Sequence, residues 1–221
     1  MCAVPAPTRS RLAAARSLER RLTERVGAVL CGGNSRRMGE DKALIVIDGV
    51  ALVALVAERC RRAGCERVVA VGGDHAALQA VGLDVVDDRH PGAGPLGGII
   101  TALTEAAPDQ LVFVVAVDLP GVEATDISRT LTALDTRPDA DLAVPLTADG
   151  RRHHLHAAWR PRALRTLEAA FEAGERAPRR ALGGLTIVDV AAIGAAGLTD
   201  VDTPEDLQRW QRDRGIRGPD R

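Results

Sequence analysis

The sequence predicts an α/β protein in which a doubly wound, mostly parallel sheet carries helices on both faces and includes one small antiparallel excursion. From Val26 onward, short apolar segments rich in β-branched residues alternate with segments of helical periodicity. The apolar segments are continuous, as expected of strands that are covered on both faces. With 221 residues, of which 46% are hydrophobic and 27% charged, the chain is long enough for one substantial domain.

The first half of this domain alternates predicted strands and helices. Glycines bound the strand over residues 26–30, and Gly64 ends the helix over residues 51–63 because glycine readily adopts the left-handed conformation after a helix. A Gly-Gly pair closes the next strand. In chain order the predicted elements are strand 26–30, helix 51–63, strand 67–71, helix 75–80, strand 84–86 and helix 96–106.

The second half opens with the most apolar strand of the chain, and Asp118 stands at its exit. Residues 147–151 predict a turn, so the strands on either side form the antiparallel hairpin. Proline begins the last two helices, where its missing N–H costs no hydrogen bond. The predicted elements are strand 111–117, helix 125–134, strands 142–145 and 156–159, helix 161–173, strand 185–190 and a helix from Pro204 to about Trp210.

Composition limits the partners and the location of the protein. Two Trp, two Phe and no Tyr leave few platforms for base stacking, and a net charge of −1 gives no general attraction to nucleic acid or to anionic membrane. No stretch approaches the roughly 20 apolar residues that span a bilayer. We expect a cytoplasmic protein that uses neither nucleic acid nor membrane. Residues 1–24 are predicted to be a disordered extension, 25–213 a single domain and 214–221 a flexible tail.

The most informative segment is the loop over residues 30–42, which reads Leu-Cys-Gly-Gly-Asn-Ser-Arg-Arg-Met-Gly-Glu-Asp-Lys. It follows a buried strand, and Gly32 and Gly33 allow backbone N–H groups to approach a polyphosphate. The spacing fits neither a P-loop nor a dinucleotide fingerprint. The cations that can follow the phosphates are Arg36, Arg37 and Lys42. The alternative interpretation is a solvated basic turn.

Other polar loops should gather at the same edge, because ligands of such sheets bind outside the carboxyl ends of the strands. Asp118 is well placed to hold Mg²⁺ through oxygen, or else it caps the next helix. Asp87 and Asp88, next to the Gly/Pro loop over 94–98, can accept hydrogen bonds from ribose hydroxyls or from a base amine. The alternative is a solvated connection between strand and helix. Asp200 and Asp202 flank a helix start, where they can cap the helix or reach the metal.

Two further groups of residues have more than one interpretation. The cysteines Cys2, Cys31, Cys60 and Cys65 form no Cys-x-x-Cys motif and are expected to be free thiols. Cys31 is either a nucleophile or simply a small residue beside the ligand. Strand alternation would put His154 and His156 on one face, next to His153, which is compatible with zinc, with acceptor binding or with hairpin packing.

A glycine loop, cations and a metal carboxylate without a convincing acid–base pair favour displacement at phosphorus. A nucleophile that is itself a phosphate monoester is already ionised at neutral pH and needs no general base. Lys42, Arg37 and Mg²⁺ would then screen the anions from one another and stabilise departing pyrophosphate.

These motifs resemble those of the nucleotidyltransferases that act on molybdenum cofactor, in particular the guanylyltransferases. The matching segments are residues 30–42, 94–98, 117–120, 154–159 and 200–207, in the family's order and spread over 26–211. The resemblance implies a Rossmann-like nucleotidyltransferase fold and transfer of GMP from GTP to the terminal phosphate of molybdopterin cofactor. It also implies transient contact with cofactor carriers or acceptor apoenzymes.

The resemblance assigns the site residue by residue. It implies that Leu30, Cys31, Gly32 and Gly33 contact GTP and that Lys42 binds the phosphates. It also implies that Asp88 contacts the nucleoside and that Asp118 binds both the nucleotide and Mg²⁺. Three departures from the family pattern affect it: Cys31 for alanine, Gly72-Gly73 where an asparagine is frequent, and His-His-Leu at 153–155 for His-Pro-Leu. A CTP-using or other small-acceptor enzyme of the same fold, and a non-catalytic nucleotide-binding module, therefore remain as alternatives.

Overall fold

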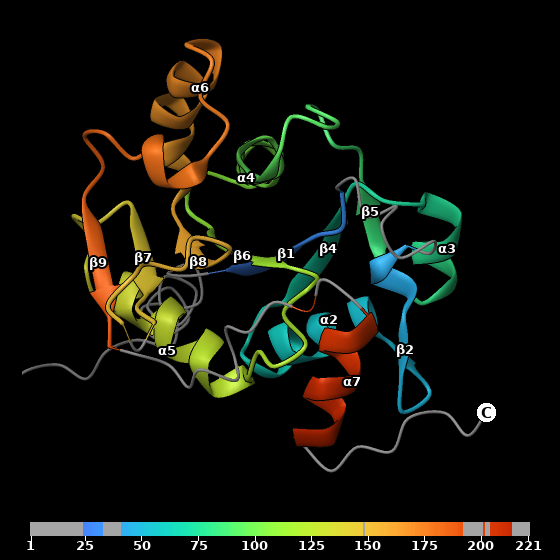
Figure 1. Ribbon diagram of the computed structural model, residues 1–221. Coiled ribbons are helices and arrows are strands. Elements are labelled where there is room, and N and C mark those ends of the chain that lie inside the picture. Colours follow the sequence, from blue (N-terminus) through green and yellow to red (C-terminus); the bar gives the residue numbers. More distant parts are fainter. Residues whose placement is uncertain (1–23, 33–40, 148, 192–200, 202–203, 214–221) are drawn as a thin grey trace, which may run out of the picture.

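The computed structural model describes residues 24–32, 41–147, 149–191, 201 and 204–213. Its centre is a seven-stranded sheet in the order β5-β4-β1-β6-β8-β7-β9, covered by helices on both faces (Figure 1). The strands of this sheet are β1 (Arg25–Leu30), β4 (Arg67–Val71), β5 (Asp84–Val86), β6 (Leu111–Ala116), β7 (Leu142–Pro145), β8 (His156–Trp159) and β9 (Ile187–Val190).

Helices connect most of these strands and form the outer layers. They are α2 (Leu52–Arg62), α3 (His75–Ala80), α4 (Pro95–Thr104), α5 (Ala124–Asp135), α6 (Leu164–Glu172) and α7 (Pro204–Asp213). Short 3-10 turns are η2 (Lys42–Leu44), η3 (Pro161–Ala163) and η4 (Pro178–Arg180). None of the helices in the described segments is both long and apolar enough to cross a membrane.

The predicted fold class is confirmed, including the antiparallel excursion. β8 runs antiparallel to β6 and to β7, whereas the other neighbouring pairs of the sheet are parallel. Thr147 N donates to the Arg151 carbonyl at 2.8 Å, which closes the predicted turn between β7 and β8. The excursion is thus a strand inserted into the main sheet. The terminal segments 1–23 and 214–221 lie outside the described residues.

Three details differ from the prediction. A two-stranded antiparallel hairpin, β2 (Val46–Ile47) with β3 (Val50–Ala51), was not predicted. The predicted helix over 161–173 is the 3-10 turn η3 followed by α6, because Pro161 and Arg160 start a tighter turn in which Ala163 N bonds to the Arg160 carbonyl. β8 begins at His156, so His154 lies in the preceding turn and the expectation that both share a strand face is wrong.

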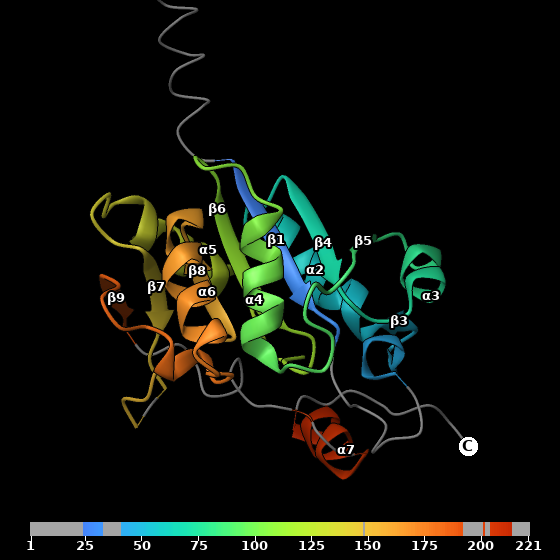
Figure 2. The ribbon, with the colours of Figure 1, turned by 90° about the horizontal axis from the view of Figure 1, so that it is seen from above.

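The sheet is buried on both faces because its central strand β6 is apolar at every position. All six residues of β6 are buried, and from Leu111 to Val115 their side chains alternate between two clusters. Phe113 and Val115 pack in the cluster that contains residues of α2 and α5, whereas Val112 and Val114 pack with residues of α4 and α6. Figures 1 and 2 show these two helix pairs on opposite faces. The core is therefore built from aliphatic side chains, as the scarcity of aromatics predicts.

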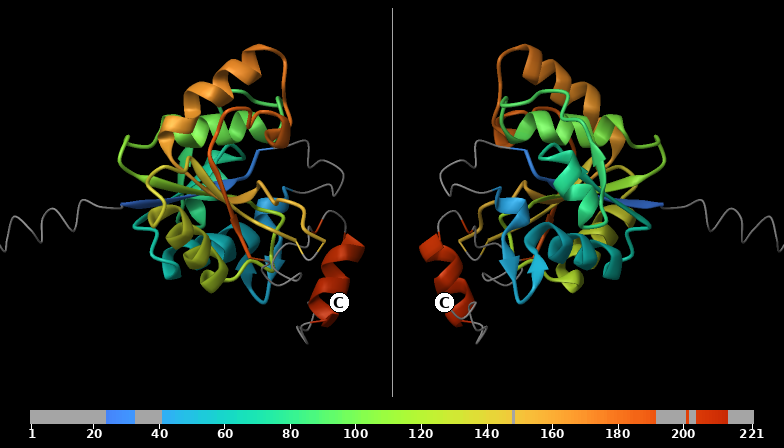
Figure 3. Two further views of the ribbon diagram at one scale, coloured as in Figure 1. Left: turned by 90° about the vertical axis from the view of Figure 1, so that its left-hand side faces the viewer. Right: turned by 90° about the vertical axis from the view of Figure 1, so that its right-hand side faces the viewer.

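The sheet changes direction of winding at its centre. β1 pairs with β4 on one side and with β6 on the other, so the connections that leave these strands diverge. In open α/β sheets this is where ligands bind, at the carboxyl ends of the strands. α7 lies by that end of the sheet (Figures 2 and 3), and its Trp210 is buried in the cluster that includes α2 and α5. The fold thus brings the carboxyl ends of β1, β4 and β6, where the predicted loops begin, to one edge of the sheet.

Candidate active site

The loops that leave β1, β4 and β6 begin side by side. Val117 N donates to the Leu30 carbonyl at 3.2 Å, which joins the exits of β6 and β1. Cys31 N and Gly32 N both donate to the Val71 carbonyl, at 3.0 and 3.1 Å, which joins the exits of β1 and β4. The predicted glycine loop is therefore anchored at its start between its two neighbouring strands.

Glycine is required where the first two loops touch. At Gly72, φ is +70° and an added Cβ would lie 3.2 Å from the Cα of Gly32. At Gly73, φ is +87° and an added Cβ would lie 2.9 Å from a methyl carbon of Leu78. Both positions demand a residue without Cβ, for conformation and for space. Gly72 and Gly73, which depart from the family pattern, thus lie in close contact with the start of the glycine loop.

Asp88 lies next to the glycine loop on the same edge of the sheet. Its Oδ1 accepts hydrogen bonds from His90 N at 2.9 Å and from the Thr101 hydroxyl at 3.2 Å. Its Oδ2 lies beside Gly32, where an added Cβ would be 3.4 Å away. Asp87 is exposed, and its Oδ1 lies 3.0 Å from Nε2 of His75. Of the two adjacent carboxylates, Asp88 is the one that contacts the glycine loop.

The start of α4 lies next to the exit of β1. Gly94 has φ +83° and Pro95 is the first helical residue, as its lack of an N–H favours. Gly98, one turn further, packs directly on Leu30: an added Cβ would lie 3.1 Å from Leu30 Cδ2. The first turn of this ten-residue helix therefore lies against the exit of β1. Free N–H groups and the helix dipole make such a terminus favourable for anions.

Asp118 lies on the other side, directly after β6. Its Oδ1 is buried, and its carbonyl accepts from Val201 N at 2.9 Å. Arg59 of α2 donates to the carbonyls of Pro120, at 2.7 Å, and of Val122. Sequence reasoning missed Arg59, because nothing local in α2 indicates that it reaches a loop some 60 residues away. This guanidinium holds the segment that follows Asp118.

Lys42 lies in the turn η2, where its side chain is only 8% exposed. Asp41 caps the turn by accepting from Ala43 N at 3.0 Å. The same carboxylate lies near Cys31, since burial first and Asp41 second raise the pKa of the Cys31 thiol well above its usual value. A protonated thiol is a poor nucleophile, so the structure favours the interpretation of Cys31 as a small residue beside the ligand.

Some predicted residues cannot be placed. Gly33, Arg36, Arg37, Asp200 and Asp202 lie outside the described residues. Among the residues that are described, Leu30, Cys31, Gly32 and Asp88 come together, and Asp118 lies on the adjoining strand exit. Over the same part of the chain, no three His, Cys, Asp or Glu side chains gather as a metal-binding group.

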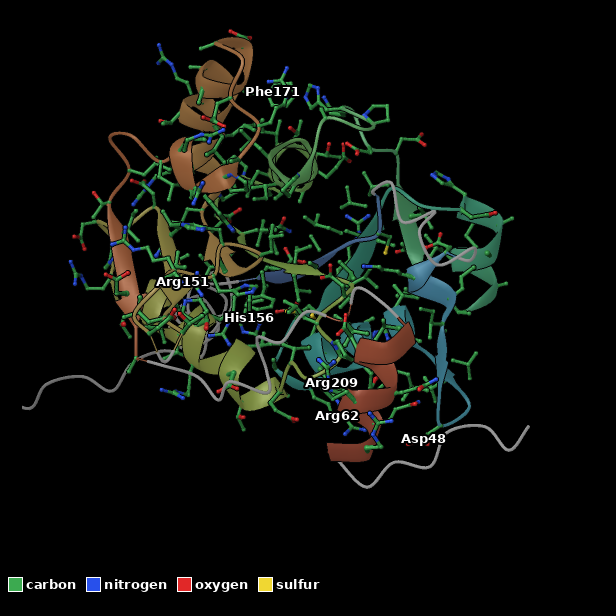
Figure 4. All side chains as sticks on the ribbon, in the orientation of Figure 1. Asp48, Arg62, Arg151, His156, Phe171 and Arg209 are labelled. Atoms are coloured by element: carbon green, nitrogen blue, oxygen red, sulfur yellow. The ribbon has the colours of Figure 1, made fainter. Side chains whose placement is uncertain are left out.

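Burial holds His154 and His156 neutral by lowering the pKa of each. His156 is fully buried, its ring meets Phe113 edge-on at 4.9 Å, and burial lowers its pKa to about 3. Figure 4 shows it in the interior, near α5. Burial, followed by the charges of Arg152, His153 and Arg179, lowers the pKa of His154 to about 4. These neutral rings are hairpin and core groups in the described structure.

Comparison with known proteins agrees with this geometry. Residues 27–189 match the model of the MobA-like NTP transferase domain. The chain belongs to the MobA-like NTP transferase family. It is 32% identical over 190 residues to a probable molybdenum cofactor guanylyltransferase of Mycobacterium ulcerans, covering 82% of this chain and 90% of that one. It is 32% identical over 201 residues to a molybdenum cofactor guanylyltransferase of Serratia proteamaculans, covering 87% and 97%.

A solved structure shares the fold. The molybdopterin-guanine dinucleotide biosynthesis protein A of Archaeoglobus fulgidus superposes with a TM-score of 0.69 at 24% identity, covering 86% of this chain and 98% of that chain. Membership of the MobA-like family makes the protein a nucleotidyltransferase and confirms that class of chemistry. The carboxyl ends of β1, β4 and β6, with the loops that begin there, are accordingly the candidate active site.

Proposed function

We propose that the protein transfers GMP from GTP to the terminal phosphate of molybdenum cofactor and releases pyrophosphate in a Mg²⁺-dependent reaction. The observation that carries this proposal is the continuous wall of Gly32, Gly72, Asp88 and the first turn of α4, which adjoins Asp118 at the centre of the sheet. The relatives from Mycobacterium ulcerans and Serratia proteamaculans carry the name of this activity.

In this proposal each residue of the candidate active site has a role. Leu30, Cys31, Gly32 and Gly33 contact GTP along the backbone, and Asp88 accepts from the nucleoside. Lys42 and Arg37 neutralise the phosphates, and Asp118 binds nucleotide and metal. The buried position of Lys42, at 8% exposure, suits a cation that pairs with an enclosed polyanion.

The chemistry needs little from the protein beyond position and charge. An oxygen of the cofactor's terminal phosphate attacks the α-phosphorus of GTP, a new P–O bond forms, and the bond to the bridging α–β oxygen breaks. The electron pair leaves with pyrophosphate, and no proton has to be removed because the nucleophile is already ionised at neutral pH. Cations that screen the two anions from each other therefore supply most of the rate enhancement.

The residues fit the proposed metal. Mg²⁺ is usually held by one or two carboxylates together with substrate phosphates and water, not by a complete cage of protein ligands. Asp118 offers a carboxylate as a hard oxygen donor, and its Oδ1 is buried. Bound there, the ion would neutralise charge on the reacting phosphates. The expected effect of replacing Asp118 is loss of transfer, not loss of fold.

The test measures pyrophosphate release with Mg²⁺ and GTP, CTP, ATP or UTP, each with and without molybdenum cofactor. Release that needs GTP and the cofactor and is lost in Asp118→Ala supports the proposal. Asp84→Ala is the matched control, because this carboxylate lies on the edge strand β5 and is 75% exposed.

Two results would refute it. Release with CTP, or only with another small phosphate acceptor, identifies a sister activity of the same fold. Nucleotide binding without release under any condition identifies a binding module.

A further inference from the structure

Within the described part of the chain, the hydrogen bonds to the Asp88 carboxylate fall on one of its two oxygens. Oδ1 accepts from the backbone N–H of His90 at 2.9 Å and from the hydroxyl of Thr101 at 3.2 Å. Oδ2 lies on the side of Gly32. Two donors on one oxygen fix the rotation of the carboxylate, so that the other oxygen faces the glycine loop. One of these donors is a side chain and can be removed without altering the backbone.

Thr101 is fully buried and lies in the second turn of α4. Its hydroxyl accepts from Arg89 N at 3.1 Å, and its single hydrogen serves two acceptors, Asp88 Oδ1 and the Gly97 carbonyl at 3.0 Å. The hydroxyl therefore joins the loop 87–94 to α4 at two points, Arg89 N and Asp88 Oδ1. Loss of the hydroxyl would leave Arg89 N and Asp88 each without one hydrogen-bond partner.

The loop around Asp88 is fixed on its other side by packing. His90 lies so close to α4 that an added Cβ on Gly97 would be 2.8 Å from the Cβ of His90. The His90 ring also contacts Phe171 of α6, with 4.4 Å between ring centroids, and Phe171 is labelled at that position in Figure 4. The backbone donor on Oδ1 thus belongs to a loop that packs against α4 and α6, and the hydroxyl of Thr101 is the other donor that the described residues supply to this oxygen.

We propose that Thr101 is a positioning residue for nucleotide recognition: it orients the Asp88 carboxylate so that its second oxygen faces the nucleotide site. This inference rests on the proposed role of Asp88 as a nucleoside contact. Thr101 itself touches no substrate. It acts on binding and not on the chemical step, because Asp88 contacts a part of the nucleotide that does not react.

The experiment compares Thr101→Val with Thr101→Ser by calorimetric binding of GTP and by steady-state kinetics. In Thr101→Val we expect the Kd and KM for GTP to rise about tenfold, the usual effect of losing one hydrogen bond to a charged group, with kcat changed less than twofold. Thr101→Ser retains the hydroxyl and restores binding to within about twofold.

Thr130→Val is the matched control. Thr130 is also fully buried in a helix, and its hydroxyl also donates to the carbonyl four residues earlier, Asp126, at 2.8 Å, but it lies in α5 and takes no part in the candidate site. We expect it to lose thermal stability to a similar degree and to bind GTP normally. A general loss of stability is thereby separated from the loss of orientation.

A double-mutant cycle with Asp88→Asn separates the two proposals. If Thr101 acts through Asp88, Thr101→Val has no further effect on GTP binding in the Asp88→Asn background. Weak binding by Asp88→Asn together with normal binding by Thr101→Val would overturn this inference and leave the proposed function intact. Normal binding by Asp88→Asn would refute the nucleoside contact itself. Equal, additive effects in both backgrounds would also overturn the inference.

Discussion

Gly97→Ala should move the wall that carries Asp88 by adding a single methyl group. The added Cβ would lie 2.8 Å from the Cβ of His90 and 3.3 Å from its carbonyl oxygen, and neither belongs to the flexible end of a side chain. Backbone must therefore shift, at a cost of about 1–3 kcal/mol for an overpacked site. The gain in helix propensity from glycine to alanine is about 1 kcal/mol. We expect a net destabilisation of about 1 kcal/mol, a fall in Tm of roughly 2–4 °C.

The same shift displaces the Asp88 carboxylate, because His90 N is one of its two donors on Oδ1. GTP binding should therefore weaken about tenfold, roughly the effect of one lost charged hydrogen bond. Thermal unfolding and calorimetric titration with GTP measure the two effects. Gly183→Ala is the control, since nothing lies within 4 Å of its added Cβ. If Gly97→Ala is as stable and binds as well as Gly183→Ala, the contact between this loop and α4 does not position Asp88.

Three further predictions follow from the fold and its titratable groups. Trp159→Ala removes a fully buried side chain from the cluster shared with α4 and α6 and should cost about 3–5 kcal/mol in urea unfolding; a cost below about 1 kcal/mol would contradict that packing. His156 has a folded pKa of about 3 against an ordinary value of 6.5, so stability is fully present above about pH 6.5 and is lost as pH falls towards 3, by about 1.4 kcal/mol per pH unit. His156→Leu should lower the slope over that range by this amount and leave the contribution of His154, whose pKa is lowered to about 4; an unchanged slope would show that His156 does not contribute. Arg59→Met removes the donor to the carbonyls of Pro120 and Val122 and should lower kcat about five- to tenfold through the loop after Asp118; unchanged kinetics would mean that the loop holds its position without Arg59.

The positions of the strands along the chain were largely predictable from local sequence. Continuous runs of β-branched residues identify buried strands. The first and last residues agree with the structure for the predicted strands 67–71, 84–86, 142–145 and 156–159. The hairpin of β2 and β3 had a usable signal that was not applied. Asp48 and Gly49 both have positive φ, at 49° and 80°, and an Asp-Gly pair between apolar residues is typical of a tight hairpin.

The candidate site was predictable where it depends on strand exits and was not where it depends on contacts between distant segments. The glycine loop and Asp88 follow strands directly, so topology alone brings them to one edge. The hydrogen bond from Thr101 to Asp88 and the reach of Arg59 to Pro120 depend on side-chain packing between segments 13 and 61 residues apart. Periodicity carries no information about such pairs.

Nucleotidyl transfer at the α-phosphorus of GTP is best tested by following the position of a radiolabel. When the α-phosphorus is labelled, we expect the label to move to molybdenum cofactor; when the γ-phosphorus is labelled, we expect it in pyrophosphate. Label from the γ-position in inorganic phosphate, or no α-label on the cofactor while GTP is consumed, would contradict it.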